Sequence, residues 1–447
     1  MKKLFSMVIA AMALMVAFTL SSCGKKPLTI WVGSECVDFY QEKANAWIAN
    51  YNATHEEEFP TTIKVQGVDA GAAAQQFLND TEAGPDIFTI PHDNMGKLTA
   101  GSSSIMAITD EELLAQIKND NPQNFIDVVQ STVQGQTYFF GVPYIAQSLI
   151  LYYNAEVLTE NDVKNWESIS AKAVASNAKA ATLLGDDGFN NSFVLLAKYY
   201  DGTELKSSIE IYKGGVETAN MVHGDDTIAA FNWAKRYFRA TPGGIDKAGS
   251  SGWEAELKDG ASLSLIGGAW NYNAAKAALG SKLGVAILPQ FTITAADAYG
   301  SIAAGTVYQS GSFADCKCFV MKKGSKYQEH LQSIVKFLSS IEVQEEAFSQ
   351  VANLPAYKNA DTEFEAMNAD TLDAKLAKCQ IEMFNYGISQ PFGFQQKYNT
   401  RFYSKNTPGL LYAWLKNTKD NTYADTSAGI KELLEYCESV WSTGVTK

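Results

Sequence analysis

Compact apolar runs alternate with amphipathic segments along the N-terminal part of the chain. The run 28–32 ends at Gly33 and predicts a buried strand. Apolar residues at helical spacing follow it, namely Tyr40, Ala44, Trp47, Ile48 and Tyr51. The same reasoning predicts a strand at 63–65, a helix at 72–78 and a strand at 87–90. This order of strands and helices predicts a parallel sheet covered by helices.

The pattern continues to the C-terminus. It predicts strands at 138–142 and 149–153, with Pro143 between them. Apolar residues recur at helical spacing within 228–238, 327–338 and 430–441, so the C-terminal segment is expected to be a packed helix. The 447 residues exceed one typical domain and contain no internal repeat or low-complexity linker. We therefore expect two lobes that the chain crosses several times.

The stretch 262–273 joins an alternating apolar run to two glycines and two aromatic residues. The run predicts a strand that ends in a tight turn at Gly267 and Gly268. Trp270 and Tyr272 follow with a spacing that places both on one face, at the carboxyl end of the strand. Open α/β sheets bind ligands at such ends, but large aromatic residues are also well buried in cores. The pattern thus leaves two interpretations of Trp270, a binding surface and a core residue.

The first residues are typical of a secretory signal. A basic tripeptide at 1–3 is followed by a mostly apolar run and small residues before Cys23, and the four residues that end in Cys23 resemble a bacterial lipobox. We expect 1–22 to be removed and Cys23 to carry lipid. Residues 23–27 would then tether the protein outside the bacterial cytoplasmic membrane or in the periplasm. A plain signal peptide or an uncleaved anchor is the alternative. No later stretch approaches the ~20 apolar residues of a spanning helix.

The amino-acid composition argues against some classes of ligand. The 49 acidic and 36 basic side chains give a net charge of −13, which becomes −15 when the signal removes Lys2 and Lys3. This balance argues against nucleic acid or an anionic membrane surface as the ligand, because either normally needs a basic patch. Aromatic residues make up 12% of the chain and charged residues 19%. Stacking on sugars or other flat ligands is one use for so many aromatic rings.

The cysteines and histidines do not form a metal-binding pattern. The five cysteines beyond Cys23 are Cys36, Cys316, Cys318, Cys379 and Cys437. Their irregular spacing favours small buried side chains over a disulfide framework. Alternation along 315–321 places Cys316 and Cys318 on one face of a strand, and the four histidines are not paired at ligand spacing. We therefore expect no metal and no cofactor.

Six segments follow one another along the chain in an order that indicates a known family of proteins. They are 84–93 with Gly96, 141–154, Trp166 with Glu167, 267–270, 284–289 and 353–355. Together they resemble the extracellular solute-binding proteins of the maltose-binding type. The resemblance implies two doubly wound α/β lobes joined by crossing segments, with a ligand cleft between them, the class II periplasmic-binding-protein-like fold. Lobe I would comprise 28–145 and 312–353, and lobe II would comprise 146–311 and 354–447.

The resemblance also implies ligand-binding roles for particular positions. Glu35 and Asp93 match acidic positions that hydrogen-bond sugar hydroxyls, although glutamates such as Glu35 are also common in solvated loops. Gln147 stands where many sugar binders carry glutamate. A carboxylate, which only accepts hydrogen bonds, is thus replaced by an amide, which also donates them. The departures from the family pattern are Asn190 and Asn191 in place of an aromatic residue, Ile90 in place of a tryptophan and Asn94 in place of an arginine.

The aromatic surface that remains for a ligand consists of Trp270 and Tyr272, with Phe392 and Phe394 as further candidates. Aromatic faces suit the apolar C–H faces of a pyranose, whose rim of hydroxyls needs donors and acceptors. The segment 390–403 aligns poorly with the family. The two phenylalanines are therefore equally compatible with a core.

These features favour a lipid-anchored binding component of an importer, without catalysis of its own. The resemblance implies a sugar or oligosaccharide ligand, the transmembrane permease subunits of an ABC importer as partners, its ATPase as an indirect one, and a monomer. A non-sugar solute such as a polyamine is an alternative, because acidic groups without basic partners suit a cation. A surface glycosidase using Glu35 and Asp93 is another, although no common hydrolase or P-loop motif occurs.

Overall fold

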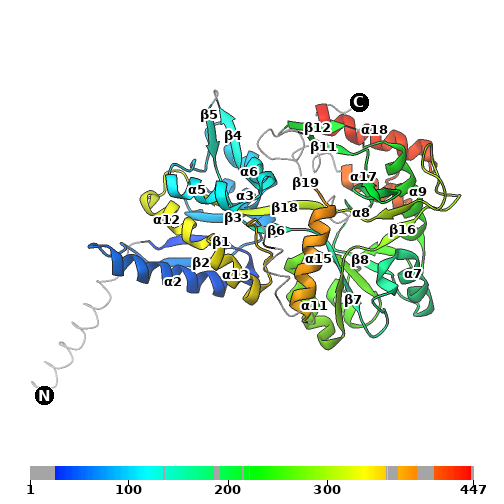
Figure 1. The fold of residues 1–447 in the computed structure, drawn as a ribbon, viewed down its shortest axis with the longest axis horizontal. Coiled ribbons are helices and arrows are strands. Elements are labelled where there is room, and N and C mark those ends of the chain that lie inside the picture. Colours follow the sequence, from blue (N-terminus) through cyan, green and yellow to red (C-terminus); the bar gives the residue numbers. More distant parts are fainter. Residues whose placement is uncertain are drawn as a thin grey trace, which may run out of the picture.

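The computed structural model describes residues 26–133, 136–185, 192–213, 216–220, 222–358, 360, 371–389 and 407–443. These residues form two lobes that lie side by side, each around a central sheet of its own (Figure 1). None of the helices in these residues has both the length and the apolar character that crossing a bilayer requires.

The first lobe is built on a mixed sheet. Its strands are β1 (Leu28–Val32), β2 (Ile63–Gly67), β3 (Ile87–Pro91), β6 (Val142–Gln147), β18 (Phe313–Met321) and β19 (Ile388–Ser389). Their order is β19-β18-β3-β1-β2, and β6 pairs with β18. β1 is parallel to β2 and β3, which confirms the parallel arrangement predicted from the apolar runs. β18 is antiparallel to β3 and β6, so it brings a distant part of the chain to the end of β3.

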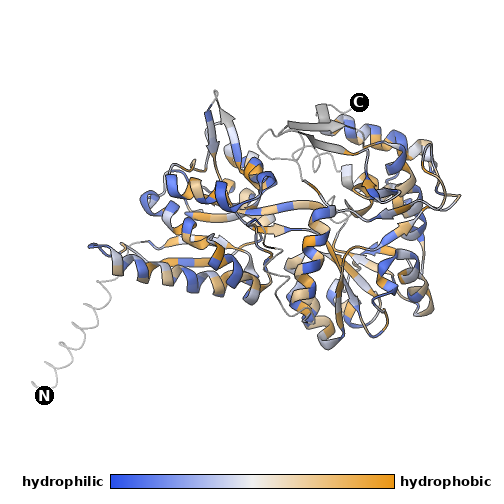
Figure 2. Cartoon of the chain, in the orientation of Figure 1, coloured by the Kyte–Doolittle hydropathy of each residue, from blue (hydrophilic) through white to orange (hydrophobic). Residues whose placement is uncertain are grey.

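Helices lie above and below this sheet in Figure 1. They are α2 (Val37–Thr54), α3 (Ala70–Asn79), α4 (Met95–Thr99), α5 (Glu111–Asp120), α6 (Gln123–Val129), α12 (Gln328–Leu338) and α13 (Ile341–Val351). The side chains of Asp69 and Asp110 accept hydrogen bonds from the first turns of α3 and α5, which satisfies backbone donors that a helix start leaves unpaired. Figure 2 shows apolar residues concentrated along the strands and mixed polar and apolar residues on the helices.

One predicted strand is divided in the structure. The hairpin of β4 (Gln130–Val133) and β5 (Gln136–Phe139) contains Tyr138, whereas β6 begins only at Val142. The prediction of a single strand at 138–142 is therefore wrong. At Gly141 the chain passes close to Met95 and Cys318, where an added Cβ would collide with the Met95 methyl group and press tightly against Cys318. The break lies where the chain leaves the hairpin and enters the main sheet.

The second lobe has a five-stranded sheet of order β13-β8-β14-β7-β15. Its strands are β7 (Ile150–Asn154), β8 (Ala181–Leu183), β13 (Ile245–Lys247), β14 (Ser264–Gly267) and β15 (Leu283–Ala286). β13, β8 and β14 are parallel, and β7 is antiparallel to β14 and β15. The predicted strand at 149–153 is β7, and the predicted strand before Gly267 is β14.

Further elements complete the second lobe. The remaining strands are β9 (Lys198–Asp201), β10 (Glu204–Lys206), β11 (Glu210–Lys213), β12 (Val216–Asn220), β16 (Gln290–Thr292) and β17 (Val307–Gln309). The helices are α7 (Trp166–Ala175), α8 (Ser192–Leu195), α9 (Asp225–Arg239), α10 (Trp253–Lys258), α11 (Tyr272–Leu279), α15 (Leu372–Tyr386), α17 (Thr407–Lys416) and α18 (Ser427–Thr443). The helices predicted within 228–238, 327–338 and 430–441 are confirmed as α9, α12 and α18.

Each lobe has its own hydrophobic core, and the chain passes from one to the other over very few residues. Ala146 packs in the first core and Leu149 in the second. Within the single strand β18, Phe313 packs in the second core and Cys316 in the first. The expectation of two lobes joined by crossing segments is thus confirmed. The boundaries predicted at 145/146, 311/312 and 353/354 stay predictions.

Candidate functional site

Polar side chains gather where the strands of the first lobe end toward the second lobe. Asp93 follows β3 directly, in the short 3₁₀ helix His92–Asn94. Lys317 of β18 pairs with Pro91, the last residue of β3, and Asp315 pairs with Gln147, the last residue of β6. The register of β18 therefore brings Asp93 and Gln147 to the same end of the sheet. Both side chains are buried.

A buried ion pair holds this end of the sheet together. The Nδ1 atom of His92 contacts a carboxylate oxygen of Asp315, and both side chains are almost fully buried. Burial by itself lowers the pKa of His92, but the charge of Asp315 and the hydrogen bond to it outweigh that effect and raise the pKa to about 9. His92 is thus a cation at neutral pH, next to Asp93 in sequence.

Asp93 is oriented by its neighbours in the same turn. The side-chain amide of Asn94 donates a hydrogen bond to Asp93 at 2.9 Å, and the ammonium of Lys97 donates one to the Oδ1 of Asn94 at 2.7 Å. Asn94, at the position where the family resemblance predicts an arginine, therefore contacts the acid beside it. The arrangement presents Asp93 as a fixed acceptor at the end of β3.

Glu35 lies at the end of β1, in the 3₁₀ helix Ser34–Cys36, and its side chain is exposed. Its neighbour Cys36 is buried and accepts a hydrogen bond from the side-chain amide of Asn353 at 3.3 Å. Burial, assisted by the negative charge of Glu35, raises the pKa of the Cys36 thiol to about 12. Cys36 is therefore a protonated, inert thiol, and the group of this pair that can meet a ligand is Glu35.

The second lobe contributes Trp270. The chain leaves β14 at Gly267, and the backbone N–H of Gly268 donates to the side chain of Asn271 at 3.1 Å. The buried hydroxyl of Tyr152 donates to the Gly268 carbonyl at 2.8 Å. The indole of Trp270 folds back over Gly268, so that a Cβ at this residue would overlap the indole ring. Gly268 thus provides the space in which the ring lies.

Trp270 and Tyr272 do not share one face. After Gly268 the chain forms the 3₁₀ helix Ala269–Asn271 and then α11, in place of an extended segment, so residues two apart point in different directions. Tyr272 is only 3% exposed, and its hydroxyl donates to Asp373 of α15. Trp270 is half-buried. The sequence pattern predicted that Trp270 and Tyr272 lie together, and Trp270 is the more exposed of the two.

Sequence reasoning missed Lys317. Its ammonium nitrogen lies over the indole of Trp270, 5.5 Å from the ring centroid, so a cation of the first lobe meets an aromatic ring of the second. The alternation that placed Cys316 and Cys318 on one face of the strand also places Lys317 on the other face. The two sulfur atoms are indeed only 3.7 Å apart. That alternation was the signal from which Lys317 could have been found.

Several predicted residues cannot be placed. Asn190, Phe392, Phe394 and the proposed lipidation site Cys23 lie outside the described residues. The described residues that the structure does bring to the junction of the lobes are Asp93, Gln147 and Trp270, joined by Lys317. Glu35 is linked to this group through its neighbour Cys36. The positive charge of Lys317 acts on the Cys36 thiol and opposes the rise of its pKa.

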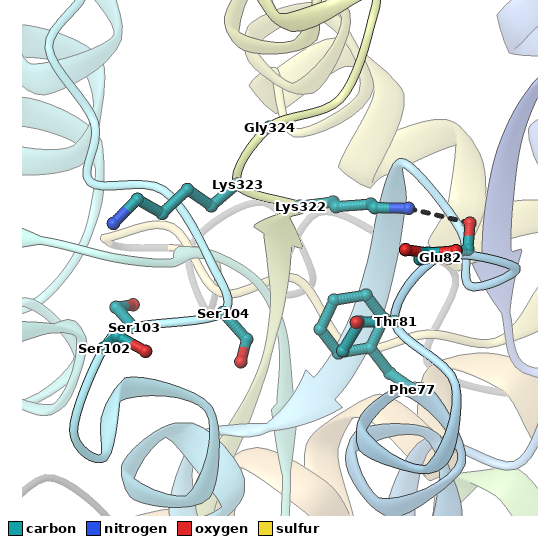
Figure 3. Close-up of a pocket in the computed structure, with 9 residues that line it drawn as sticks. All are labelled: Phe77, Thr81, Glu82, Ser102, Ser103, Ser104, Lys322, Lys323 and Gly324. Carbon is teal, nitrogen blue, oxygen red and sulfur yellow. Dashed lines mark hydrogen bonds between the residues drawn. The ribbon is translucent and has the colours of Figure 1, made fainter.

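A separate cavity of about 460 Å³ lies at the opposite end of the first sheet. It is lined by Phe77, Thr81, Glu82, Ser102, Ser103, Ser104, Lys322, Lys323 and Gly324. Lys322 follows the last residue of β18 and donates to the backbone oxygen of Glu82 at 3.1 Å (Figure 3). Because Met321 pairs with Ile87, the first residue of β3, this cavity is remote from Asp93.

Comparison with known proteins supports the family suggested by the sequence motifs. A maltooligosaccharide ABC transporter solute-binding lipoprotein of Streptococcus pneumoniae strain R6 is 25% identical over 366 residues, which cover 78% of this chain and 76% of the relative. The maltodextrin-binding protein MalE1 of L. casei BL23 superposes with a TM-score of 0.68 at 19% identity, covering 94% of this chain and 99% of its own. MalX of Streptococcus pneumoniae in complex with maltopentaose gives a TM-score of 0.66 at 18% identity, with 91% and 99% covered.

These structural likenesses confirm the predicted fold of two α/β lobes. In addition, the model of the family described as bacterial extracellular solute-binding protein matches residues 46–377, about three quarters of the chain. The chain belongs to the family of bacterial extracellular solute-binding proteins.

Proposed function

We propose that the chain is the substrate-binding component of a carbohydrate ABC importer and holds an oligosaccharide between its two lobes. The observation that carries this proposal is the contact of Trp270 in the second lobe with Lys317 of the first, which pairs with the last residue of β3 shortly before Asp93. An aromatic face with a few fixed donors and acceptors suits a pyranose. The relatives named for maltooligosaccharides and maltodextrins support a sugar over a polyamine.

The proposed roles divide between the lobes. Trp270 stacks on a sugar ring, and Glu35, Asp93 and Gln147 hydrogen-bond its hydroxyls. Asn190 is a further proposed contact, as are Phe392 and Phe394 on the sequence resemblance alone. Tyr272, which sequence reasoning counted among the ligand-binding residues, is not proposed to contact the ligand, because its ring is buried and its hydroxyl donates to Asp373.

Ligand binding is proposed to act by population shift. A ligand that contacts both lobes only when they are closed stabilises the closed state, and the permease responds to that state. The chain is proposed to pass between the lobes near 145/146, 311/312 and 353/354. Cys23 carries the lipid that holds the protein at the outer face of the membrane. The chain acts as a monomer and has no catalytic activity.

A thermal-shift panel tests the ligand class. Maltooligosaccharides should raise the unfolding temperature of the purified mature chain, because a ligand at about 100 times its Kd adds about 2.7 kcal/mol to the stability. Spermidine at the same concentration should leave the unfolding temperature unchanged, and the saccharides should be recovered uncleaved. A shift with spermidine and none with any saccharide would overturn the carbohydrate assignment, and cleavage products would favour a glycosidase.

Gly268→Ala should weaken saccharide binding about tenfold. The new methyl group displaces the indole of Trp270, and forcing a side chain out of a packed position costs about 1–3 kcal/mol. Titration calorimetry measures the change, with Gly71→Ala near the start of α3 as the control, because a Cβ added at Gly71 approaches Asp69 and not Trp270, and the φ of Gly71 is not positive. Equal affinity of the two variants would show that the position of Trp270 is irrelevant to the ligand.

A further inference from the structure

Lys317 is placed at the junction of the lobes by the strand that crosses between them. On either side of it, the backbone of β18 pairs with Pro91 of β3 and Ile145 of β6. The side chain is half-buried. Its position is therefore fixed by the centre of the first sheet, while its ammonium group reaches Trp270 of the second lobe.

The ammonium group of Lys317 forms no ion pair and no hydrogen bond with any of the residues that the structure describes. Its contact there is the face of the Trp270 indole, at 5.5 Å from the centroid. An ammonium group has three hydrogen-bond donors, and half-buried charges normally find acceptors. Lys317 thus offers unused donors beside the ring that is proposed to stack on the ligand.

A stacked sugar would supply the missing acceptors. The hydroxyl groups of a pyranose lie around its rim, so a sugar that covers the indole extends its oxygen atoms past the edge of the ring. The four-carbon stem of lysine is flexible, so the ammonium group can follow those oxygens. Glu35 and Asp93 provide acceptors only, and Lys317 provides donors only, so together they match both kinds of hydrogen bond that a hydroxyl forms.

The positive charge of Lys317 also affects cationic ligands such as polyamines, the competing ligand class. An aromatic face attracts cations, and the acidic residues nearby would add to that attraction for a polyamine. Lys317 already holds a positive charge over the indole, and a second cation on the same face would be repelled. A neutral ligand experiences no such repulsion.

We propose that Lys317 is a specificity-determining ligand contact, which donates hydrogen bonds to the hydroxyl oxygens of the sugar stacked on Trp270 and excludes cationic solutes from that ring. The proposal rests on the proposed function and adds a residue that neither the sequence motifs nor the family resemblance pointed to. The contact between Lys317 and Trp270 could have either of two roles, and they predict opposite effects on ligand binding. A lysine that merely covers the ring would hinder the ligand, whereas a lysine that binds the ligand would hold it.

The test compares Lys317→Met with Lys276→Met in titrations of maltopentaose into the mature chain. The ammonium group of Lys276 lies over the ring of Tyr272, 5.2 Å from its centroid. This control therefore removes the same charge and the same kind of contact, at a ring two residues from Trp270 in sequence. Lys317→Met should weaken binding about tenfold or more, a change of about 1.4 kcal/mol. Lys276→Met should bind like the unaltered chain. Unchanged or tighter binding by Lys317→Met would overturn the proposal.

Two further arms keep the result interpretable. Lys317→Arg retains the charge and the donors, so it should bind more tightly than Lys317→Met. Lys317→Leu, which also removes the charge and the donors, replaces the methionine variant if that variant does not fold. Spermidine should bind Lys317→Met more tightly than the unaltered chain, and equal binding would refute the exclusion of cations. If the unaltered chain binds no saccharide at all, the proposed function fails, whereas normal binding with an unaffected Lys317→Met refutes only the role of Lys317.

Discussion

Replacing Trp270 with alanine should weaken saccharide binding about 30-fold or more. The expected loss is about 2 kcal/mol, the range found for buried aromatic anchors of binding sites, and each 1.4 kcal/mol corresponds to a factor of ten in Kd. The indole is the ring that the second lobe presents to Lys317 of the first, so its removal takes away the stacking surface that faces both lobes. Titration calorimetry with maltopentaose measures the effect.

Tyr272→Phe is the matched control for this variant. It alters a ring two residues away whose hydroxyl donates to Asp373 inside the second lobe, so the affinity should not change. Trp270→Ala should also remain folded, because Trp270 is half-buried and lies beside, not within, the core of its lobe. If Trp270→Ala binds as tightly as Tyr272→Phe, the ligand does not stack on this residue.

His92→Ala should lower the free energy of unfolding by about 3–5 kcal/mol, the usual cost of removing one partner from a buried ion pair. The substitution leaves the carboxylate of Asp315 buried without its counter-charge. Adding Asp315→Asn to His92→Ala should recover part of the loss, because the uncompensated charge is then removed. Denaturant unfolding of both single variants and the double variant gives the coupling energy. Strictly additive losses would show that the pair contributes no coupling.

The same pair predicts how stability depends on pH. The pKa of His92 is raised from 6.5 to about 9 in the folded chain, so the proton is bound more tightly in the folded state. Its stabilising effect is fully present below pH 6.5 and is lost as the pH rises through about 9, a total of about 3 kcal/mol. His92→Gln should remove this decline. A parallel decline in His92→Gln would assign it to other groups.

Local pattern was enough to predict the strands and helices that build the two lobes. The run 28–32 and the run 87–90 became β1 and β3 because their apolar side chains are buried, on alternate positions in β1 and throughout 87–90 in β3, which requires little knowledge of the rest of the chain. Asp93 was assigned from the family resemblance, and its place shortly after a buried strand, at the carboxyl end of that strand, agrees with the assignment. Trp270 followed from the glycines that end β14.

The contacts that depend on the pairing of distant segments could not be predicted in this way. Lys317 stands beside Pro91 only because β18 is antiparallel to β3, and it meets Trp270 only because the two lobes are adjacent. The burial of Tyr272 in a helix was not predicted, for a local reason. The sequence after Gly268 is compatible with an extended turn, but the hydrogen bond from Gly268 to Asn271 starts a helix there instead.

A crystal structure of the mature chain with maltopentaose tests the central claim most directly. We predict density for a sugar ring packed against the indole of Trp270, with hydroxyl groups within hydrogen-bonding distance of Asp93 or Glu35 in the other lobe. A saccharide that contacts only one lobe, or that lies away from Trp270, would contradict the claim that the ligand is held between the lobes.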